Sequence, residues 1–337
     1  MIINSSAPTR IDLAGGTADI WPLYLFHPGA RTVNIAIDQR AKVKVERTGG
    51  NAIEIVSEDL GAQAHFNSID YVDEALKEKH PLEMVLRLLA FFQPKGGLKI
   101  RTSCMSPAGA GLGGSSALNV ALCGALNALI EGRYSREELL TIAKNVETQV
   151  LRIPAGVQDY YPAMYGGLNS VLLEVTGEGV LRHSHILAHQ IATRMVLVYS
   201  GKSRNSGFNN WDVMKNYLDG NSDVQKHLFG IQEAAQEVEA ALKTGRWPDV
   251  ARAIEYEMSH RRQLSPGIST PEIEELAAFA RENGAQAAKI CGAGGGGCVM
   301  FWVNPSDKQL LRGKLREKGS QVIDFHVDSE GLSVTSV

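Results

Sequence analysis

The sequence predicts an α+β protein of two domains, and three observations lead to this prediction. The length of 337 residues exceeds the roughly 100–200 residues of one domain. The first half mixes short strands with helices, and the second half places several long helices before a further set of strands. Helices packed on one face of an antiparallel sheet fit this order. We therefore expect one domain at residues 1–187 and another at 188–337.

Strands are predicted at the start of the first domain. Residues 33–47 alternate apolar and polar side chains, which is typical of a half-buried strand. Residues 53–55 continue this alternation after the glycine pair at 49–50, so the two strands are expected to form a hairpin. Another short strand is expected at residues 98–102.

Helices are predicted next along the chain. Residues 115–130 are small and apolar through several helical turns. Ser135 and Glu138 form a capping box, which predicts a helix from there to about Val150. A strand at residues 168–175 is expected to follow this helix.

The second domain contains one helix whose two ends are marked in the sequence. Thr270 before Pro271 is typical of a helix N-terminus, and Asn283 before Gly284 is typical of a C-terminus. The other elements expected here are helices at 208–219, 222–244, 247–263 and 307–318, and strands at 195–199, 287–291, 298–303 and 321–327.

Charge and composition exclude several classes of function. Lys plus Arg number 34 and Asp plus Glu number 37, for a formal charge of -3, whereas nucleic acids and anionic membranes require clustered positive charge. No apolar stretch reaches the about 20 residues of a membrane span. The four cysteines form no C-x-x-C pair, which favours reduced thiols. The sequence therefore predicts a soluble cytoplasmic protein that binds neither nucleic acid nor membrane.

A glycine-rich run followed by a helix is the strongest functional signal. It reads Pro107-Ala-Gly-Ala-Gly-Leu-Gly-Gly-Ser-Ser-Ala117. Glycines let successive N–H groups converge on an anion, and the N-terminus of a helix adds partial positive charge. We therefore predict a phosphate-binding loop, formed by Pro107, Gly109, Ala110, Gly111, Leu112, Gly113, Gly114, Ser115 and Ser116.

Two other nucleotide-binding motifs fit less well. A Walker A loop requires a lysine that this run lacks, and for Gly201-Lys202-Ser203 the first required glycine would fall on Val196. Gly109, Gly111 and Gly114 match the dinucleotide pattern G-x-G-x-x-G, but the acidic residue expected about 20 positions later is missing. Dinucleotide binding stays open as a weak alternative.

Two further segments accompany this loop, in a fixed order along the chain. The first is Ala7-Pro-Thr-Arg10-Ile-Asp-Leu-Ala-Gly-Gly16, and the last is Lys289-Ile-Cys-Gly-Ala-Gly-Gly-Gly-Gly297. Together the three segments resemble the GHMP kinases, the family of galactokinase, homoserine kinase, mevalonate kinase and phosphomevalonate kinase. The resemblance implies an N-terminal domain like domain 2 of ribosomal protein S5, a ferredoxin-like C-terminal domain, and ATP and Mg²⁺ as cofactors.

A fourth segment resembles the heptose-phosphate kinase branch of that family. It reads Gly156-Val-Gln-Asp-Tyr-Tyr-Pro-Ala-Met-Tyr-Gly-Gly167. The resemblance makes Asp159 the catalytic carboxylate that faces the acceptor hydroxyl, as a base or only to orient it, whereas a helix-capping aspartate is the structural alternative. Arg10 is implied as its catalytic partner, because a guanidinium stabilises developing negative charge and holds a carboxylate ionised.

The resemblance also implies a metal site. The family carries a metal-binding glutamate in the helix that follows the capping box, and that residue is Glu147 here. A serine of the phosphate-binding loop would supply a second oxygen. Alignment favours Ser115 and keeps Ser116 as the alternative, because Gly114 replaces a serine that is common in the family.

The acceptor implied by the resemblance is a sugar or sugar phosphate, phosphorylated at its anomeric hydroxyl as in heptose 7-phosphate kinases or fucokinases. Asp19 corresponds to a sugar-binding aspartate of the family. Mevalonate kinase activity and a non-catalytic ligand sensor remain alternatives, and a homodimer is possible. The residues expected to bind the acceptor are Arg10, Asp19, Asp159, Tyr165, Arg204, Gly294 and Gly295.

A phosphate on the acceptor would require a cation at the far end of the sugar. Arg31, Lys202 and Arg204 are the candidates.

Overall fold

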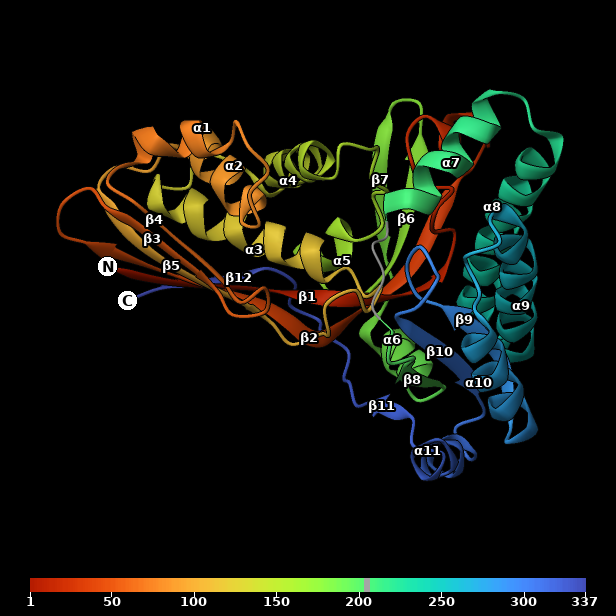
Figure 1. The fold of residues 1–337 in the computed structure, drawn as a ribbon. Helices are drawn as coiled ribbons and strands as arrows, with labels where there is room; N and C mark the ends of the chain where they lie inside the picture. The colour runs from red at the N-terminus through yellow and green to blue at the C-terminus, as the bar shows by residue number, and fades with distance from the viewer. Residues whose placement is uncertain (203–206) are drawn as a thin grey trace.

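The computed structural model describes residues 1–202 and 207–337, and it contains two sheets, each with its own helices (Figure 1). The first sheet has the order β12-β1-β2-β5-β3-β4, and β6 joins it through β2 and carries β7. Its strands are β1 (Ile2–Ala14), β2 (Arg31–Thr48), β3 (Ile53–Ser57), β4 (Ala62–Phe66), β5 (Gly97–Cys104), β6 (Leu168–Glu174), β7 (Gly177–Arg182) and β12 (Ser333–Ser336).

Helices cover one face of this sheet (Figure 1). The apolar α3 lies against β1 and β2, and its side chains form the centre of a large core between the helices and the sheet. The helices are α1 (Val72–Ala75), α2 (Glu83–Phe92), α3 (Gly114–Leu129), α4 (Arg136–Leu151) and α5 (Tyr160–Tyr165), with short 3-10 turns at Leu23–Phe26 and Ile69–Tyr71.

The second sheet has the order β11-β8-β10-β9 and is antiparallel throughout. With helices between β8 and β9 and between β10 and β11, this is the expected ferredoxin-like arrangement. Its strands are β8 (Met195–Tyr199), β9 (Ala285–Ile290), β10 (Cys298–Val303) and β11 (Gln321–Ile323), and its helices are α6 (His185–Ala192), α7 (Gly207–Leu218), α8 (Ser222–Thr244), α9 (Trp247–Leu264), α10 (Pro271–Glu282) and α11 (Lys308–Glu317).

The two parts share a core. Apolar side chains at the ends of β1 and β2, such as Ile11 and Ile35, pack with Leu197 of β8 and Trp302 of β10. Every residue of β10 is buried, because one face of its sheet meets this shared core and the other meets a core with α8 to α11. The α+β prediction is confirmed, and the two sheets are held in contact by apolar packing.

Most predicted elements are confirmed, including the capping box of Ser135 and Glu138 and the Thr270 cap. The hairpin of residues 33–47 with 53–55 is wrong. β5 lies between the two strands, antiparallel to β2 and parallel to β3. After β3 the chain forms β4 and the helices α1 and α2, and it then returns to the sheet as β5. The carbonyl oxygen of Gly50 instead accepts a hydrogen bond from Gly97 N at the start of β5.

β1 and β12 had no strand prediction. β12 pairs with β1, so residues 333–336 lie in the first sheet although the predicted boundary assigns them to the second domain. The strand predicted at 321–327 ends at Ile323. No helix in the part of the chain that the structure describes is both long and apolar enough to cross a membrane.

Candidate active site

A cleft of about 590 Å³ brings the predicted motifs together. Its walls contain the whole phosphate-binding loop, Arg10 from the first segment, Asp19 shortly after that segment, and Glu147 and Asp159. Residues 291–294 and Gly296 of the last segment complete it. Segments far apart in the sequence therefore meet at one place, as the motif order predicts.

The phosphate-binding loop depends on three glycines. Gly109, Gly111 and Gly113 have φ values of 69°, 73° and 73°, a region that residues with a Cβ rarely adopt. Gly113 is the N-cap of α3, and the first intrahelical hydrogen bond runs from Ala117 N to Gly113 O. The N–H groups of residues 114–116 precede that bond, so the cleft contains the N-terminus of a long helix, which is suited to a phosphate.

The last glycine-rich segment packs directly against this loop. A Cβ on Gly111 would lie 2.3 Å from Cys291 O, and one on Gly297 would lie 2.7 Å from Ala110 O. Cys298 N donates to Ala110 O at 2.7 Å. Both positions therefore require glycine, because a side chain at either one would push the two glycine runs apart.

Arg10 and Asp159 form an ion pair beside the loop. Arg10 Nη2 lies 2.6 Å from Asp159 Oδ1, and Nη1 donates to Gly111 O at 2.6 Å. The Arg10 side chain is only 3% exposed, whereas that of Asp159 is 22% exposed. Asp159 occupies the N-cap position of α5 but makes no capping hydrogen bond, so its carboxylate serves the ion pair and faces the cleft.

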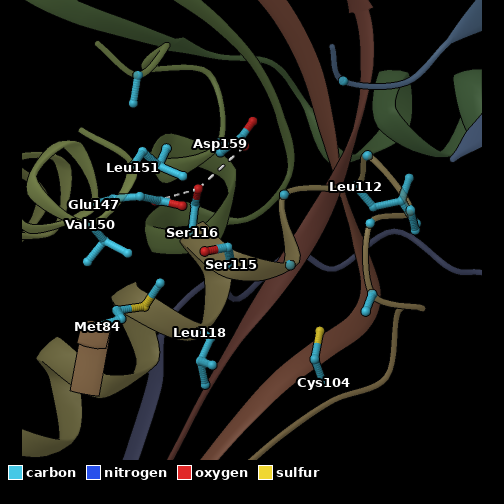
Figure 2. Close-up of a pocket in the computed structure, with 18 of the residues that line it drawn as sticks. Met84, Cys104, Leu112, Ser115, Ser116, Leu118, Glu147, Val150, Leu151 and Asp159 are labelled. Carbon is cyan, nitrogen blue, oxygen red and sulfur yellow. Dashed lines mark hydrogen bonds between the residues drawn. The ribbon is translucent and has the colours of Figure 1, made fainter. Parts of the chain in front are cut away.

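Ser116 lies between Glu147 and Asp159. Ser116 Oγ donates to Glu147 Oε2 at 2.8 Å and lies 3.4 Å from Asp159 Oδ2, as the dashed lines in Figure 2 show. Tyr160 donates to the same Glu147 oxygen at 2.7 Å. Burial raises the pKa of Glu147, and the hydrogen bonds from Tyr160 and the two serines oppose that rise.

The oxygen atoms of this group suit a magnesium ion. Mg²⁺ takes carboxylate and hydroxyl oxygens and keeps several waters, and here a carboxylate and two serines stand at an anion-binding helix terminus. Ser116 is buried and bonded to Glu147, while Ser115 is exposed beside it (Figure 2). The resemblance names Ser115 first, and both serines contact the Glu147 carboxylate, so both stay candidates for the metal.

Asp19 is completely buried, yet it forms part of the wall of the cleft. Its Oδ2 accepts from Gln158 N at 2.9 Å, and its Oδ1 has no hydrogen-bond partner among the described residues. Burial, with a contribution from the charges of Asp159 and Asp12, raises the pKa of Asp19 to about 6. The neighbouring Gln158 also presents an unpartnered Oε1 within the described part of the chain.

We call Thr17, Asp19 and Gln158 the polar subsite. The sequence predicted no role for Thr17 or Gln158. Gln158 could have been found from its position, because it directly precedes Asp159 in the fourth segment. A second group of lining residues is the apolar subsite, and Figure 2 shows its side chains near Ser115 and Glu147. It consists of Met84, Leu118, Val150 and Leu151.

Two family models match the chain. The model described as GHMP kinases N terminal domain covers residues 76–167, and that described as GHMP kinases C terminal covers residues 238–321. The chain belongs to the GHMP kinase family. It is accordingly a phosphotransferase with an alcohol group as acceptor and ATP as the phosphoryl donor.

Several proteins resemble this GHMP kinase over its whole length. It is 26% identical over 334 residues to D-glycero-alpha-D-manno-heptose 7-phosphate kinase of Campylobacter jejuni, with 98% of each chain covered. It is 27% identical to mevalonate kinase of Pyrococcus furiosus, with 100% of this chain and 99% of the relative covered. A solved structure titled as a D-glycero-D-manno-heptose 1-phosphate kinase from Bacteroides thetaiotaomicron shares the fold, with a TM-score of 0.77, 23% identity and 99% of each chain covered.

Some predicted acceptor residues of this GHMP kinase lie elsewhere. Tyr165 donates to Glu137 at 3.0 Å and is not among the described residues that line the cleft. Gly294 lines the cleft, whereas Gly295 does not; its N–H donates to Ile268 O at 2.7 Å. Tyr165 and Gly295 were predicted only because they belong to the motifs. Membership of a motif does not determine in which direction a residue points.

The structure does not bring the three candidate phosphate anchors together within the described residues. Arg31 pairs with Glu239 at 2.7 Å and does not line the cleft. Lys202 pairs with Glu272, and its carbonyl accepts from Gly297 N at 2.8 Å, which places its backbone against the last glycine run. Arg204 lies outside the described residues.

Proposed function

We propose that this GHMP kinase transfers the terminal phosphoryl group of ATP to a hydroxyl group of a sugar or sugar phosphate, with the anomeric hydroxyl of a heptose 7-phosphate as the first candidate. The observation that carries the proposal is the ion pair of Arg10 and Asp159, which stands between the phosphate-binding loop and the polar subsite. The Campylobacter relative, named as a heptose 7-phosphate kinase, supports the choice of acceptor.

The nucleotide is expected to span the loop and the apolar subsite. Its phosphates would accept hydrogen bonds from the N–H groups at the start of α3, where the helix dipole favours negative charge. Its base would lie among Met84, Leu118 and Val150, which offer apolar surface within the same cleft.

Mg²⁺ would be held by Glu147 together with Ser116 or Ser115. When bound, the ion neutralises negative charge on the β- and γ-phosphates. Tyr160 orients the carboxylate, since its hydroxyl donates to the oxygen that also accepts from Ser116. Ionised Glu147 is the form that can bind a cation, so the rise in its pKa predicts that metal affinity weakens on acidification.

Asp159 and Arg10 act on the acceptor. The carboxylate accepts a hydrogen bond from the hydroxyl and takes its proton as the bond from oxygen to the γ-phosphorus forms and the bond from that phosphorus to the β,γ-bridging oxygen breaks. Arg10 remains charged throughout, and because it bridges Asp159 and Gly111 O it fixes the carboxylate relative to the loop. Phosphoryl transfer depends mainly on such positioning and on charge neutralisation.

The polar subsite favours the hydroxyl groups of a sugar over the carboxylate of mevalonate, and a 7-phosphate would have to lie away from this subsite, at the far end of the sugar. Asp19 and Gln158 offer unpartnered oxygens, which accept hydrogen bonds from hydroxyl groups. Among the described lining residues the Lys and Arg side chains are Arg10, which is paired with Asp159, and Lys79, which precedes the helix that carries Met84. A carboxylate beside ionised Asp19 would therefore be repelled.

The experiment measures ADP release from ATP and Mg²⁺ with D-glycero-D-manno-heptose 7-phosphate, fucose and mevalonate, followed by NMR of the product's anomeric carbon. We expect turnover of the heptose phosphate with the phosphoryl group on the anomeric oxygen. Turnover of mevalonate in place of the sugars would refute the proposal, and ATP binding without turnover of any acceptor would favour a ligand sensor.

Lys202→Gln tests the phosphate anchor. If Lys202 contacts a 7-phosphate, its loss should raise KM for the phosphorylated heptose far more than it lowers kcat, because the contact is remote from the transferred group. The KM for a neutral sugar should not change. Equal KM changes for both sugars would assign the effect to the lost Glu272 pair.

A further inference from the structure

Behind the polar subsite lies a cluster of four buried charged side chains. Asp12 comes from β1, Lys289 from β9, and Glu257 and Arg261 from α9; each is at most 1% exposed. Lys289 Nζ donates to Asp12 Oδ2 at 2.9 Å and lies 3.4 Å from Glu257 Oε1. Arg261 donates from Nε to Glu257 Oε1 at 3.0 Å, so two positive and two negative groups offset each other.

One member of this cluster reaches the segment that follows β1. Arg261 Nη2 donates to Gly16 O at 2.7 Å, and Nη1 donates to Thr17 Oγ1 at 2.9 Å. Arg261 and Glu257 do not line the cleft within the described chain, whereas Thr17 and Asp19 do. The guanidinium therefore contacts a residue that lines the cleft but does not line the cleft itself.

The segment held by Arg261 is conformationally costly. Thr17 has a φ of 70°, and a β-branched residue in the left-handed region is disfavoured. A Cβ on Gly16 would lie 2.7 Å from Gln158 Nε2 and 2.8 Å from Asp12 Oδ2. Such a backbone persists only where its surroundings fix it, and Arg261 supplies two of the hydrogen bonds that do so.

A purely stabilising role accounts poorly for this cluster. Burying ions costs desolvation free energy that their attraction often fails to recover, so apolar residues of similar size would serve stability equally well. The fork of a guanidinium, however, can hold two acceptors in fixed directions. That property is used here on Gly16 and Thr17.

We propose that Arg261 is a positioning residue for the acceptor. Glu257, Asp12 and Lys289 hold its guanidinium in place, and the guanidinium in turn fixes Gly16 and Thr17. It thereby orients the side chains of the polar subsite toward the acceptor. The inference rests on the proposed function, because the polar subsite is assigned there to the acceptor. It predicts an effect on acceptor binding that is separate from nucleotide binding.

Arg261→Lys keeps the charge but loses the fork. We expect the acceptor KM to rise on the order of tenfold, with kcat less affected and nucleotide affinity within about twofold of the unchanged protein. Arg262→Lys is the matched control, since Arg262 is the next residue of α9 and pairs with Glu274 instead. An unchanged acceptor KM in Arg261→Lys, or an equal loss of nucleotide affinity, would overturn the proposal.

Thr17→Val extends the test without disturbing the four charges. If Arg261 acts through Thr17, the KM effects of Arg261→Lys and Thr17→Val should be strongly non-additive in the double variant, and Thr17→Ser should restore binding. Independent, additive effects would contradict the mechanism.

Amide hydrogen exchange gives a readout that does not need turnover. Arg261→Lys should speed exchange in residues 16–19 of the full chain while leaving residues 114–117 unchanged, even if none of the tested sugars is phosphorylated. Failure of the acceptor panel with faster exchange at 16–19 would refute the proposed function and keep the positioning role. Normal exchange would refute the positioning role itself.

Discussion

At the phosphate-binding loop, one continuous segment supplies the N–H groups, the serines and the helix terminus, whereas the polar subsite is assembled from two separate segments, one with Thr17 and Asp19 and the other with Gln158. The loop gains its shape from glycine φ values and close backbone packing. The polar subsite gains its shape from buried side chains, one of which has a shifted pKa. We therefore expect the nucleotide and the acceptor to be bound by different physical means, and variants in the two regions should separate their effects.

Asp159→Asn should give the largest effect, because Asp159 stands between the two regions. We expect kcat to fall by a factor on the order of 10²–10⁴, the usual contribution of general-base catalysis, with nucleotide affinity nearly unchanged. Steady-state kinetics and nucleotide titration test this, with Asp73→Asn at an exposed position of α1 as a control. A variant with near-normal kcat would remove Asp159 from the mechanism.

Gly111→Ala should act mainly on the loop. Its Cβ would meet Cys291 O, so the two glycine runs must move apart, and we expect nucleotide affinity to fall at least about tenfold with a lower thermal midpoint. Gly132→Ala is a matched control, because Gly132 has the same φ of 73° and an added Cβ there would have no atom of the described chain within 4 Å. Equal behaviour of the two variants would show that φ strain, not packing of the glycine runs, decides the outcome.

Glu147→Gln and Ser116→Ala should raise the Mg²⁺ concentration needed for half-maximal activity, on the order of tenfold, because each removes an oxygen ligand from a site with few protein ligands. Ser115→Ala tests the alternative ligand. A larger effect in Ser115→Ala than in Ser116→Ala would return the metal to the residue that alignment favours.

Asp19→Asn should weaken acceptor binding while stabilising the fold. The pKa of about 6 lies above the ordinary 3.8, so ionisation costs stability as pH rises from about 4 through 6, and the cost is complete above that range. We expect the variant to gain about 1–3 kcal/mol at pH 7.5 and much less at pH 4.5, measured by denaturant unfolding. The acceptor KM should rise, because Oδ1 would no longer carry charge. A stability gain that does not depend on pH would show that burial does not raise the pKa of Asp19.

Sequence reasoning recovered the loop because its information is local. Glycine spacing and a following helix specify a backbone shape without any knowledge of neighbours, as Gly109, Gly111 and Gly113 confirm. It did not single out Thr17 and Gln158, which line the cleft. It placed Tyr165 in the acceptor site, whereas the Tyr165 hydroxyl contacts Glu137 and is not among the described lining residues, because side-chain direction depends on tertiary packing. The same limit explains the wrong hairpin: alternation in residues 33–47 and 53–55 predicts strands, but it carries no information on which strand lies beside which.

The pairing of β1 with β12 bears on how the protein is made. Ile3 pairs with Ser336, so β1 gains its second neighbour only after residues 333–336 have been synthesised. Until then β1 presents an unpaired strand edge, which is a template for association with other chains. Growing chains of this protein are therefore expected to be most vulnerable to aggregation along β1, and a chaperone that covers that edge during translation would raise the yield of native protein.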